Sequence, residues 1–357
     1  MIGAGIIGLS LAIELHKQRL HVLVIEKGKP GREASWAAGG MLADFPFEMP
    51  LALRDLASAS ATMYPEFVHQ LQDESGLKID LRSHGSLLFF EDSPQPCALD
   101  DREWSAGWDD REPDLDASFL KANYRAGIYL KERSVDPRDL TSAAVDACRH
   151  RSVDFSSGNQ VLEVILNEGK ASGVRTSKTS FSGGMVVNCA GAWAGQFSPY
   201  PIPTRPVKGQ MLCVIMPQRE MIRHVVRTPA VYLIPRSDGR MLIGATAEES
   251  GFDKRTVPET IQELRQAALD IVPKLSEARF LDAWAGLRPA TPDLLPMLGP
   301  TVIAGYFVAT GHFRDGILLA PITAKLMGQV MTGQKPSIDI ANFSADRFVR
   351  EARWSAS

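Results

Sequence analysis

A glycine motif near the start of the chain constrains its fold more than any other feature. Residues 3–8 read Gly-Ala-Gly-Ile-Ile-Gly, residues 6–17 have the apolar spacing of a helix, and residues 21–26 form a short β-branched run that ends in Glu26. This order is typical of a dinucleotide-binding unit, in which glycines admit a pyrophosphate and the acid binds a ribose hydroxyl. By itself, Glu26 could also be an ordinary charge at a strand end. The combination predicts a Rossmann-like domain.

The same motif raises a question about the first strand. In a dinucleotide fold the glycine turn follows a buried parallel strand of about five residues. Here only Met1 and Ile2 precede Gly3. The sequence therefore predicts that the true start lies upstream, or alternatively that the first strand has been lost. In either case we expect the chain as written to bind its cofactor poorly or to be unstable.

Three later segments favour a flavin over a nicotinamide dinucleotide. Residues 32–42 (REASWAAGGML) are rich in small side chains that let backbone approach a large flat ligand, although this composition also suits a flexible loop. Residues 185–195 (MVVNCAGAWAG) predict a strand and glycine turn that return to the nucleotide. Residues 306–310 predict a strand, which is followed by the turn GHFRDG and a helix from about Ile317 to Met331. The first amides of that helix would face the flavin where negative charge accumulates on reduction.

Composition narrows the remaining choices. The formal net charge is −3 with no long basic block, so nucleic acid is not predicted as a partner. Four scattered cysteines without a CxxC pair argue against a disulfide framework and against a zinc site, and they fit a reducing cytosol. No run of 18 apolar residues predicts a membrane span, and the start lacks the pattern of a signal peptide. We therefore expect a cytoplasmic protein without a bound metal.

Local patterns divide the chain into two kinds of structure. A helix is predicted for residues 135–150, with Asp136 as its cap and Pro137 at its first position. Hairpin strands are predicted for residues 158–174, and proline-broken polar sequence fills residues 91–116. Between residues 206 and 296, the following segments suit an antiparallel sheet covered by helices: strands 211–216, 230–236 and 241–246, and helix 258–272.

The prediction is an α/β and α+β chain of two discontinuous domains. A Rossmann-like FAD-binding domain takes residues 1–75, 135–205 and 298–357. A substrate-binding domain built on an antiparallel sheet takes residues 76–134 and 206–297.

Taken together, these segments resemble the glycine oxidase branch (ThiO type) of the D-amino-acid oxidase family, which is tied to thiamine biosynthesis. The likeness runs from Gly3 to Ala324 and is carried by GAGIIG, VIEKG, SWAAGGML, SVDPRDLT, NCAGAW, PVKGQML, YLIPRSDGRMLIGATAEESGFD, WAGLRPATPD and ATGHFRDGILLAPITA. The resemblance implies the GR2/DAO type of FAD-binding domain, a small amino acid as substrate, and a homo-oligomer, which is a tetramer in relatives. Some relatives hold flavin covalently through a C-terminal cysteine, but no cysteine follows Cys213. The FAD is therefore expected to be non-covalent.

The resemblance also implies which residues contact the cofactor. They are Gly3, Gly5, Ile6, Ile7 and Gly8 at the pyrophosphate turn, Glu26 and Lys27 at the ribose, Ala34 and Ser35 nearby, Gly39, Gly40 and Met41 beside the flavin, Val161 at the adenine, Gly191 in the second glycine turn, and His312, Phe313, Arg314, Asp315, Gly316, Ile317 and Leu318 along the isoalloxazine. We do not assign His312 as a general base, since hydride transfer from a neutral amine needs none.

For the substrate, the resemblance implies that Arg288 and Arg314 hold the carboxylate and that Tyr232 lends its hydroxyl. A planar guanidinium holds a carboxylate by two hydrogen bonds. From the residues alone, either arginine could instead form a structural ion pair, with Asp293 or Asp315, and Tyr232 could be a core residue. Relatives often carry asparagine where this chain has Asp315, and that charge is expected to weaken the grip of Arg314.

The implied reaction is an oxidative deamination. The α-hydride moves to FAD, the imine hydrolyses to a 2-oxo acid or feeds thiazole synthesis, and O2 reoxidises the flavin to give hydrogen peroxide. One alternative is a D-amino-acid or amine dehydrogenase that passes electrons to a quinone or a partner protein. A tRNA-modifying oxidase domain is disfavoured because the chain lacks a basic excess. A flavin-binding protein without turnover also stays open, and the loop at residues 43–50 leaves substrate size undetermined.

Overall fold

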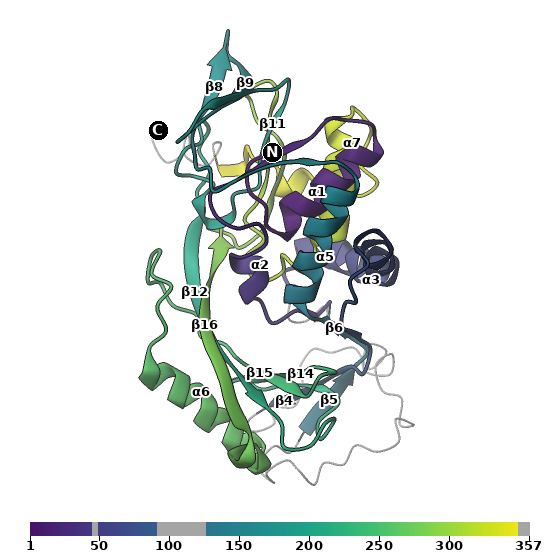
Figure 1. Ribbon diagram of the computed structural model, residues 1–357, viewed down its shortest axis with the longest axis vertical. Coiled ribbons are helices and arrows are strands. Elements are labelled where there is room, and N and C mark those ends of the chain that lie inside the picture. Colours follow the sequence, from purple (N-terminus) through teal and green to yellow (C-terminus); the bar gives the residue numbers. More distant parts are fainter. Residues whose placement is uncertain (45–48, 91–125, 349–357) are drawn as a thin grey trace.

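The computed structural model describes residues 1–44, 49–90 and 126–348, without the side chains of residues 90 and 126–128. The polar segment at residues 91–116, with its cysteine, lies outside the described residues, as do residues 45–48 of the loop at residues 43–50. Figure 1 shows the helices α1, α3, α5 and α7 gathered in one half of the molecule, with a broad sheet and α6 in the other. Two long strands, β12 and β16, run from one half into the other. Within the described residues, no helix combines the length and apolarity that a membrane crossing requires.

A parallel sheet forms the centre of the first half. β1 (Leu23–Glu26) pairs in parallel with β7 (Asp154–Ser157), and β11 (Val186–Asn188) pairs in parallel with β18 (Tyr306–Thr310). β17 (Met297–Pro300) then pairs antiparallel with β18. The predicted strands at residues 21–26, 185–188 and 306–310 are thus all present.

The first residues of the chain lie between β1 and β11. The Ile2 amide donates to Val187 O at 2.9 Å, and the Gly3 amide donates to Ile25 O at 2.8 Å. Ile2 forms parallel bridges on both sides, to Ile25 and to Asn188. Three residues therefore occupy the central position in which a strand of about five was expected.

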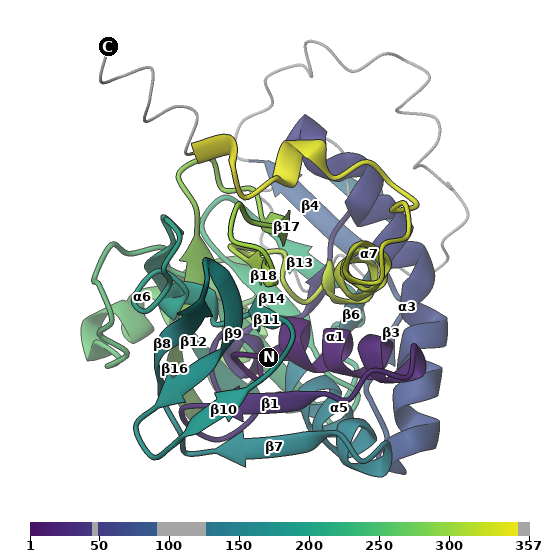
Figure 2. The ribbon, with the colours of Figure 1, turned by 90° about the horizontal axis from the view of Figure 1, so that it is seen from above.

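Four of the described helices enclose the larger core of this half, and two of them, α1 and α7, pack directly on the sheet. The four helices are α1 (Ile6–Lys17), α3 (Arg54–Ser75), α5 (Pro137–His150) and α7 (Ala320–Met331). Seen from above, α1 lies beside α7, which itself packs on β17, and α5 lies on the other side of α1 (Figure 2). The predicted cap is present, because the Asp136 carboxylate accepts a hydrogen bond from the Arg138 amide at 2.8 Å.

The start of α7 differs from the prediction. The helix begins at Ala320 rather than near Ile317. Tyr64 and Ser60 on α3 donate side-chain hydrogen bonds, both 2.6 Å long, to the carbonyls of Ile317 and Leu318. Because these carbonyls accept hydrogen bonds from α3, the residues before Ala320 form turns. The regular helical hydrogen bonds begin at Ala320, one residue before Pro321.

The second half is a seven-stranded sheet with the order β16-β12-β15-β14-β13-β4-β5. Its pairs are antiparallel except for β13 with β4, which is parallel. α6 (Pro258–Ile271) covers one face over an apolar core. The strands are β4 (Ser86–Phe90), β5 (Ala126–Leu130), β12 (Arg205–Ile215), β13 (Val225–Arg227), β14 (Tyr232–Pro235), β15 (Arg240–Gly244) and β16 (Arg279–Ala290).

One strand of this sheet is longer than predicted, and four were not predicted. β12 begins at Arg205, six residues before the predicted strand, whereas no strand was predicted for β4, β5, β13 or β16. Polar residues at Lys208 and Gln210 hid the start of β12, yet both side chains are buried. Glu248 satisfies them, since it lies 3.7 Å from the Lys208 ammonium and accepts from the Gln210 amide at 2.8 Å.

Smaller elements complete the described chain. β8 (Val161–Asn167) and β9 (Lys170–Thr176) form the predicted hairpin, with β10 (Ser180–Ser182) at its edge. α2 (Ala34–Ala37) follows β1. The remaining strands are β2 (Met41–Leu42), β3 (Leu81–Arg82) and β6 (Arg133–Val135), and the 3-10 turns are Leu51–Leu53, Gly191–Trp193, Pro273–Glu277 and Ala341–Phe343.

Candidate active site

A cavity of about 580 Å³ runs between the two halves of the molecule. Loops after the parallel strands form one end, and the sheet face of β12, β13, β14 and β16 forms the other. Its volume lies within the usual range for cofactor and ligand sites. Of the predicted site residues, all line this cavity except Gly8 and Leu318.

The glycine turn is shaped for close approach of backbone to a ligand. A Cβ at Gly3, where φ is +98°, would lie 2.5 Å from Cys189 O. A Cβ at Gly8 would lie 2.1 Å from Gly3 O, so this glycine permits the packing of helix on turn and does not face the cavity. Gly5 precedes α1 and has no side chain that could cap the helix. Backbone amides in the first turn can therefore bind an anion.

Polar side chains stabilise the glycine turn by accepting hydrogen bonds from backbone amides. One Glu26 oxygen accepts from the Ala4 amide at 2.8 Å, and the other accepts from the Gly28 amide at 2.9 Å. The Ser35 hydroxyl accepts from the Ile6 amide at 2.9 Å. Glu26 thus shapes the turn itself, and a carboxylate retains lone pairs that a ribose hydroxyl can use.

The segments on either side of the cavity suit a flat ligand. Gly39 has no room for a side chain, since a Cβ would lie 2.7 Å from the Ile234 side chain. At the far end, the Lys27 ammonium lies 3.0 Å from the centre of the Trp193 ring. Backbone at the middle of the cavity and an aromatic–cation pair at its end fit a flavin and its nucleotide, respectively.

Arg288 projects into the cavity from β16. Its Nη1 donates to Thr246 O at 2.9 Å, and its guanidinium lies over Gly209, where a Cβ would come within 2.4 Å of Nη1. Across the described part of the chain, no carboxylate forms a salt bridge with Arg288. Asp293 pairs with Arg347 at 2.7 Å and not with Arg288.

Tyr232 lies beside Arg288 on the same sheet face. The two side chains interact, and burial raises the pKa of the Tyr232 hydroxyl while Arg288 opposes that shift. The hydroxyl therefore stays protonated at neutral pH and can donate a hydrogen bond. A guanidinium and a phenol that face one cavity form a suitable site for a carboxylate.

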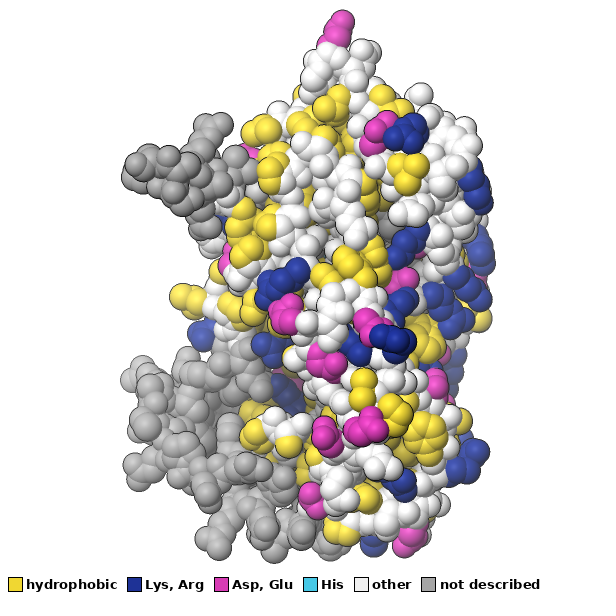
Figure 3. Space-filling model, turned by 90° about the vertical axis from the view of Figure 1, so that its left-hand side faces the viewer, with side chains coloured by type: hydrophobic (Ala, Val, Ile, Leu, Met, Phe, Trp, Pro, Cys, Tyr) yellow, Lys and Arg dark blue, Asp and Glu magenta, His cyan; other side chains and the backbone are white. Residues whose placement is uncertain are grey.

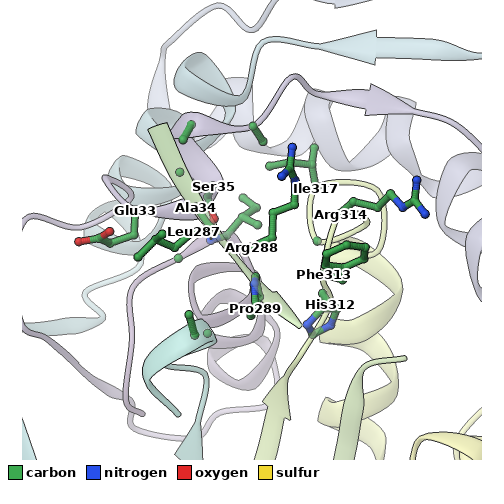
Figure 4. Close-up of a pocket in the computed structure, with 18 of the residues that line it drawn as sticks. Glu33, Ala34, Ser35, Leu287, Arg288, Pro289, His312, Phe313, Arg314 and Ile317 are labelled. Atoms are coloured by element: carbon green, nitrogen blue, oxygen red, sulfur yellow. Dashed lines mark hydrogen bonds between the residues drawn. The ribbon is translucent and has the colours of Figure 1, made fainter. Parts of the chain in front are cut away.

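The turn after β18 places its residues in different environments. His312 is buried with Nε2 3.1 Å from the Thr323 hydroxyl, and burial lowers the pKa of His312 to about 3, so the ring is neutral. Arg314 is exposed at the cavity mouth, and in Figure 4 its side chain extends away from Arg288. Burial raises the pKa of Asp315 to about 6, although the neighbouring Arg314 opposes this. Leu318 points into the main core.

The cavity also contains residues that the sequence did not single out. They are Met49, Leu88, Gln160, Ala190, Trp193, Met211, Arg227, Thr228 and Thr246, among others. Arg227 stands out because it is charged and its side chain is only 11% exposed. The hairpin of residues 225–235 is a signal that could have found it, since an antiparallel register places Arg227 opposite Tyr232.

Comparison with known proteins agrees with this geometry. Residues 1–330 match the FAD dependent oxidoreductase (DAO) family, and the chain belongs to that family. It is 33% identical to a glycine oxidase of Pseudomonas aeruginosa over 96% of this chain and 97% of that protein. It is 31% identical to hydrogen cyanide synthase subunit HcnC of the same organism, over 98% and 95% of the respective chains.

A solved structure is similar as well. The crystal structure of glycine oxidase from Geobacillus kaustophilus superposes with a TM-score of 0.90 at 29% identity, covering 97% of both chains. The predicted fold class and the FAD cofactor are thereby confirmed.

Proposed function

We propose that this enzyme oxidatively deaminates glycine or another small amino acid. The observation that carries the proposal is Arg288, a cavity-facing guanidinium that has no carboxylate partner among the described residues and lies beside the Tyr232 hydroxyl. The similarity to glycine oxidases of P. aeruginosa and G. kaustophilus supports the same assignment.

In this proposal the chain contributes position more than chemistry. When bound, FAD supplies the two-electron oxidant for the Cα–N bond, which leaves an imine that water hydrolyses to a 2-oxo acid. Arg288 and Tyr232 hold the substrate carboxylate, and Arg314 adds positive charge at the cavity mouth. His312 is neutral and bonded to Thr323, so it serves as packing and not as a proton acceptor.

The cofactor contacts of the proposal follow the cavity wall. The glycine turn and the start of α1 hold the pyrophosphate, Glu26 and Lys27 lie at the ribose, and the segment Gly39–Met41 lies beside the isoalloxazine. No cysteine follows Cys213 in the sequence, and we propose that FAD is held non-covalently. Acid precipitation of the pure protein should then release all of the yellow colour into the supernatant.

One experiment tests the central assignment. Purified protein loaded with FAD is mixed anaerobically with glycine, sarcosine and small D-amino acids, and bleaching of the flavin absorbance is recorded. We expect rapid bleaching by at least one compound. Arg288→Ala should lower kcat/KM for that compound by about 10²- to 10³-fold, because two charge-assisted hydrogen bonds are lost. Retained turnover in Arg288→Ala would show that the carboxylate binds elsewhere.

A second candidate concerns the electron acceptor. The similarity to HcnC, which is by its name a subunit of a larger synthase, favours a dehydrogenase that passes electrons to a quinone or a protein. Oxygen uptake with stoichiometric peroxide supports the oxidase that we propose. Bleaching that is reversed by a quinone but not by oxygen supports the dehydrogenase.

A further inference from the structure

Arg227 brings a second, largely buried guanidinium to the substrate end of the cavity. It ends β13, where it lies opposite Tyr232 on β14 and opposite Leu88 on β4. Residues directly opposite in an antiparallel pair project from the same sheet face. All three residues line the cavity, so Arg227 shares the face on which the proposed carboxylate site is built.

The Arg227 side chain is held in place by a buried acid. It is 11% exposed, and its Nη1 lies 2.9 Å from Oε2 of Glu132, whose side chain is 3% exposed. A buried ion pair is often no more stable than apolar side chains of the same volume. Packing alone therefore does not explain a charged pair at the wall of a ligand cavity.

The charges around this end of the cavity point to an anionic ligand group. Burial, and then the positive charge of Arg314, lower the pKa of Arg227 to about 10, so it is still charged at neutral pH. Arg227, Arg288 and Arg314 thus bring three positive charges to one cavity, against the two carboxylates of Glu132 and Asp315. Glycine has a single carboxylate, which Arg288 and Tyr232 already serve in the proposed function.

A guanidinium can serve two acids at once. It has five N–H donors arranged along more than one edge, so it can keep Glu132 and still bind a ligand carboxylate. Glu132 fixes the orientation of the side chain, which lowers the entropy lost when a ligand binds.

We propose that Arg227 binds a second acidic group of the substrate, so that the preferred substrates are small dicarboxylic amino acids. This inference rests on the proposed function, because it takes the first carboxylate to be held by Arg288. The second carboxylate can be attached at the α-carbon, as in D-aspartate, or at the nitrogen, as in iminodiacetate. The chemistry that Arg227 recognises is the same in both.

The test compares each acid with its amide, which has nearly the same shape but no charge. kcat/KM is measured for D-aspartate against D-asparagine, and for iminodiacetate against its monoamide. We expect at least one acid to be preferred by about tenfold or more. The double variant Arg227→Gln/Glu132→Gln removes both charges and should bring that acid-to-amide ratio close to one. The control Arg223→Gln, an exposed arginine four residues away, should keep the wild-type ratio.

Arg227→Lys provides a second variant in case the double variant does not fold. It keeps a positive charge next to Glu132 but loses the planar fork, and the ratio should fall only in part. Bleaching by glycine together with ratios near one for both pairs in the wild type would overturn this inference alone. Absence of bleaching by every compound would overturn the proposed function and this inference with it. A wild-type ratio that survives in both Arg227 variants would assign the second carboxylate to another residue.

Discussion

The guanidinium of Arg288 lies over a glycine, and this single-residue detail governs where a substrate carboxylate can bind. Because Gly209 has no side chain, Nη1 of Arg288 can lie directly over its backbone, and the hydrogen bond to Thr246 O orients the guanidinium. Because the obstructed atoms belong to the end of a flexible side chain, a methyl group at Gly209 would move Arg288 rather than unfold β12. Position and stability are therefore separable at this residue.

Gly209→Ala should lower kcat/KM for the best substrate by about tenfold to 10²-fold, since displacing a binding group by about 1 Å has effects of this size. The free energy of unfolding should change by less than about 1 kcal/mol. Steady-state kinetics and urea unfolding measure the two quantities. Gly184→Ala is the matched control, because no atom lies near the added carbon and the backbone is not in the left-handed region. Gly251→Ala also has open space, but its φ of +57° would strain any side chain. Equal loss of stability and activity would contradict the separation.

Asp315 gives the site a pH dependence of defined sign. Burial raises its pKa to about 6, so above pH 6 it carries a negative charge beside Arg314 and below pH 6 it loses that charge. The cost of burying the charge is absent below the unfolded-state pKa of about 3.9 and complete above about pH 6. The ionised Asp315 side chain therefore weakens binding of the substrate carboxylate only in the upper part of this pH range.

Asp315→Asn should therefore lower KM for the best substrate by about two- to fivefold at pH 8 and leave it unchanged at pH 5, in line with the energy of a partly exposed charge pair. The ratio of wild-type KM to variant KM, measured from pH 5 to pH 8, cancels the ionisation of the substrate amine. A ratio that does not vary with pH would show that Asp315 does not act through its charge.

At the scale of elements, Asp136 joins α5 to the hairpin of β14 and β15. It caps α5 through the Arg138 amide and accepts from Arg240 at 2.8 Å, while Arg236 lies 3.9 Å away. Arg236 in turn donates to Gly39 O at 2.6 Å, in the segment that we place beside the flavin. The cap of one helix and the wall of the cofactor site thus depend on the same carboxylate.

Asp136→Asn keeps a helix cap but removes the buried charge, and we expect it to lower the free energy of unfolding by about 3–5 kcal/mol, the cost of breaking a buried pair. Burial opposes ionisation of Asp136, but Arg236 and Arg240 outweigh it and hold its pKa below the usual 3.8. Its contribution is thus present above pH 4 and is lost as the pH falls further. The deficit of the variant should shrink in the same range.

Asp238→Asn is the matched control, because Asp238 pairs with the same Arg240 at 2.6 Å but is half exposed. It should change the free energy of unfolding by no more than about 1 kcal/mol. Urea unfolding at pH 7 and at about pH 3 compares the two variants. Similar losses in both would mean that the charge of Asp136 is not important to the fold.

At the scale of the whole molecule, the cavity joins two bodies of structure. One wall comes from the loops of the parallel sheet, and the other comes from the face of the seven-stranded sheet. On the molecular face in Figure 3, basic side chains lie among acidic ones instead of forming a separate positive field. This view agrees with the net charge of −3 and with a small molecule as the partner.

FAD should stabilise both bodies together. At a concentration of about 100 times its Kd, FAD should add about 2.7 kcal/mol and raise Tm by roughly 5 °C or more. Differential scanning calorimetry of the apoprotein with FAD, ADP or riboflavin measures the shift in Tm. ADP and riboflavin, each of which is only part of FAD, should each give a smaller shift than FAD. Two transitions of which FAD moves only one would show that the sheets unfold independently.

Local sequence determined the elements whose causes lie within a few residues. The glycine turn, α1 and β1 follow from spacing, and the start of α5 follows from Asp136 and Pro137. The identity of Arg288 and Tyr232 as candidate residues came from motifs that span nearly the whole chain. Unlike that resemblance, caps, turns and apolar periods act over short range, so the elements that they define need no knowledge of distant partners.

Tertiary structure decided the features that depend on partners far apart in the chain. The buried start of β12 depends on Glu248, and the late start of α7 depends on Tyr64 and Ser60. Only the pairing of β13 with β14 and β4 shows that Arg227 faces the cavity. Register and long-range hydrogen bonds arise from packing of segments that no local window contains, and this is why the sequence indicated the cofactor end of the cavity more fully than its substrate end.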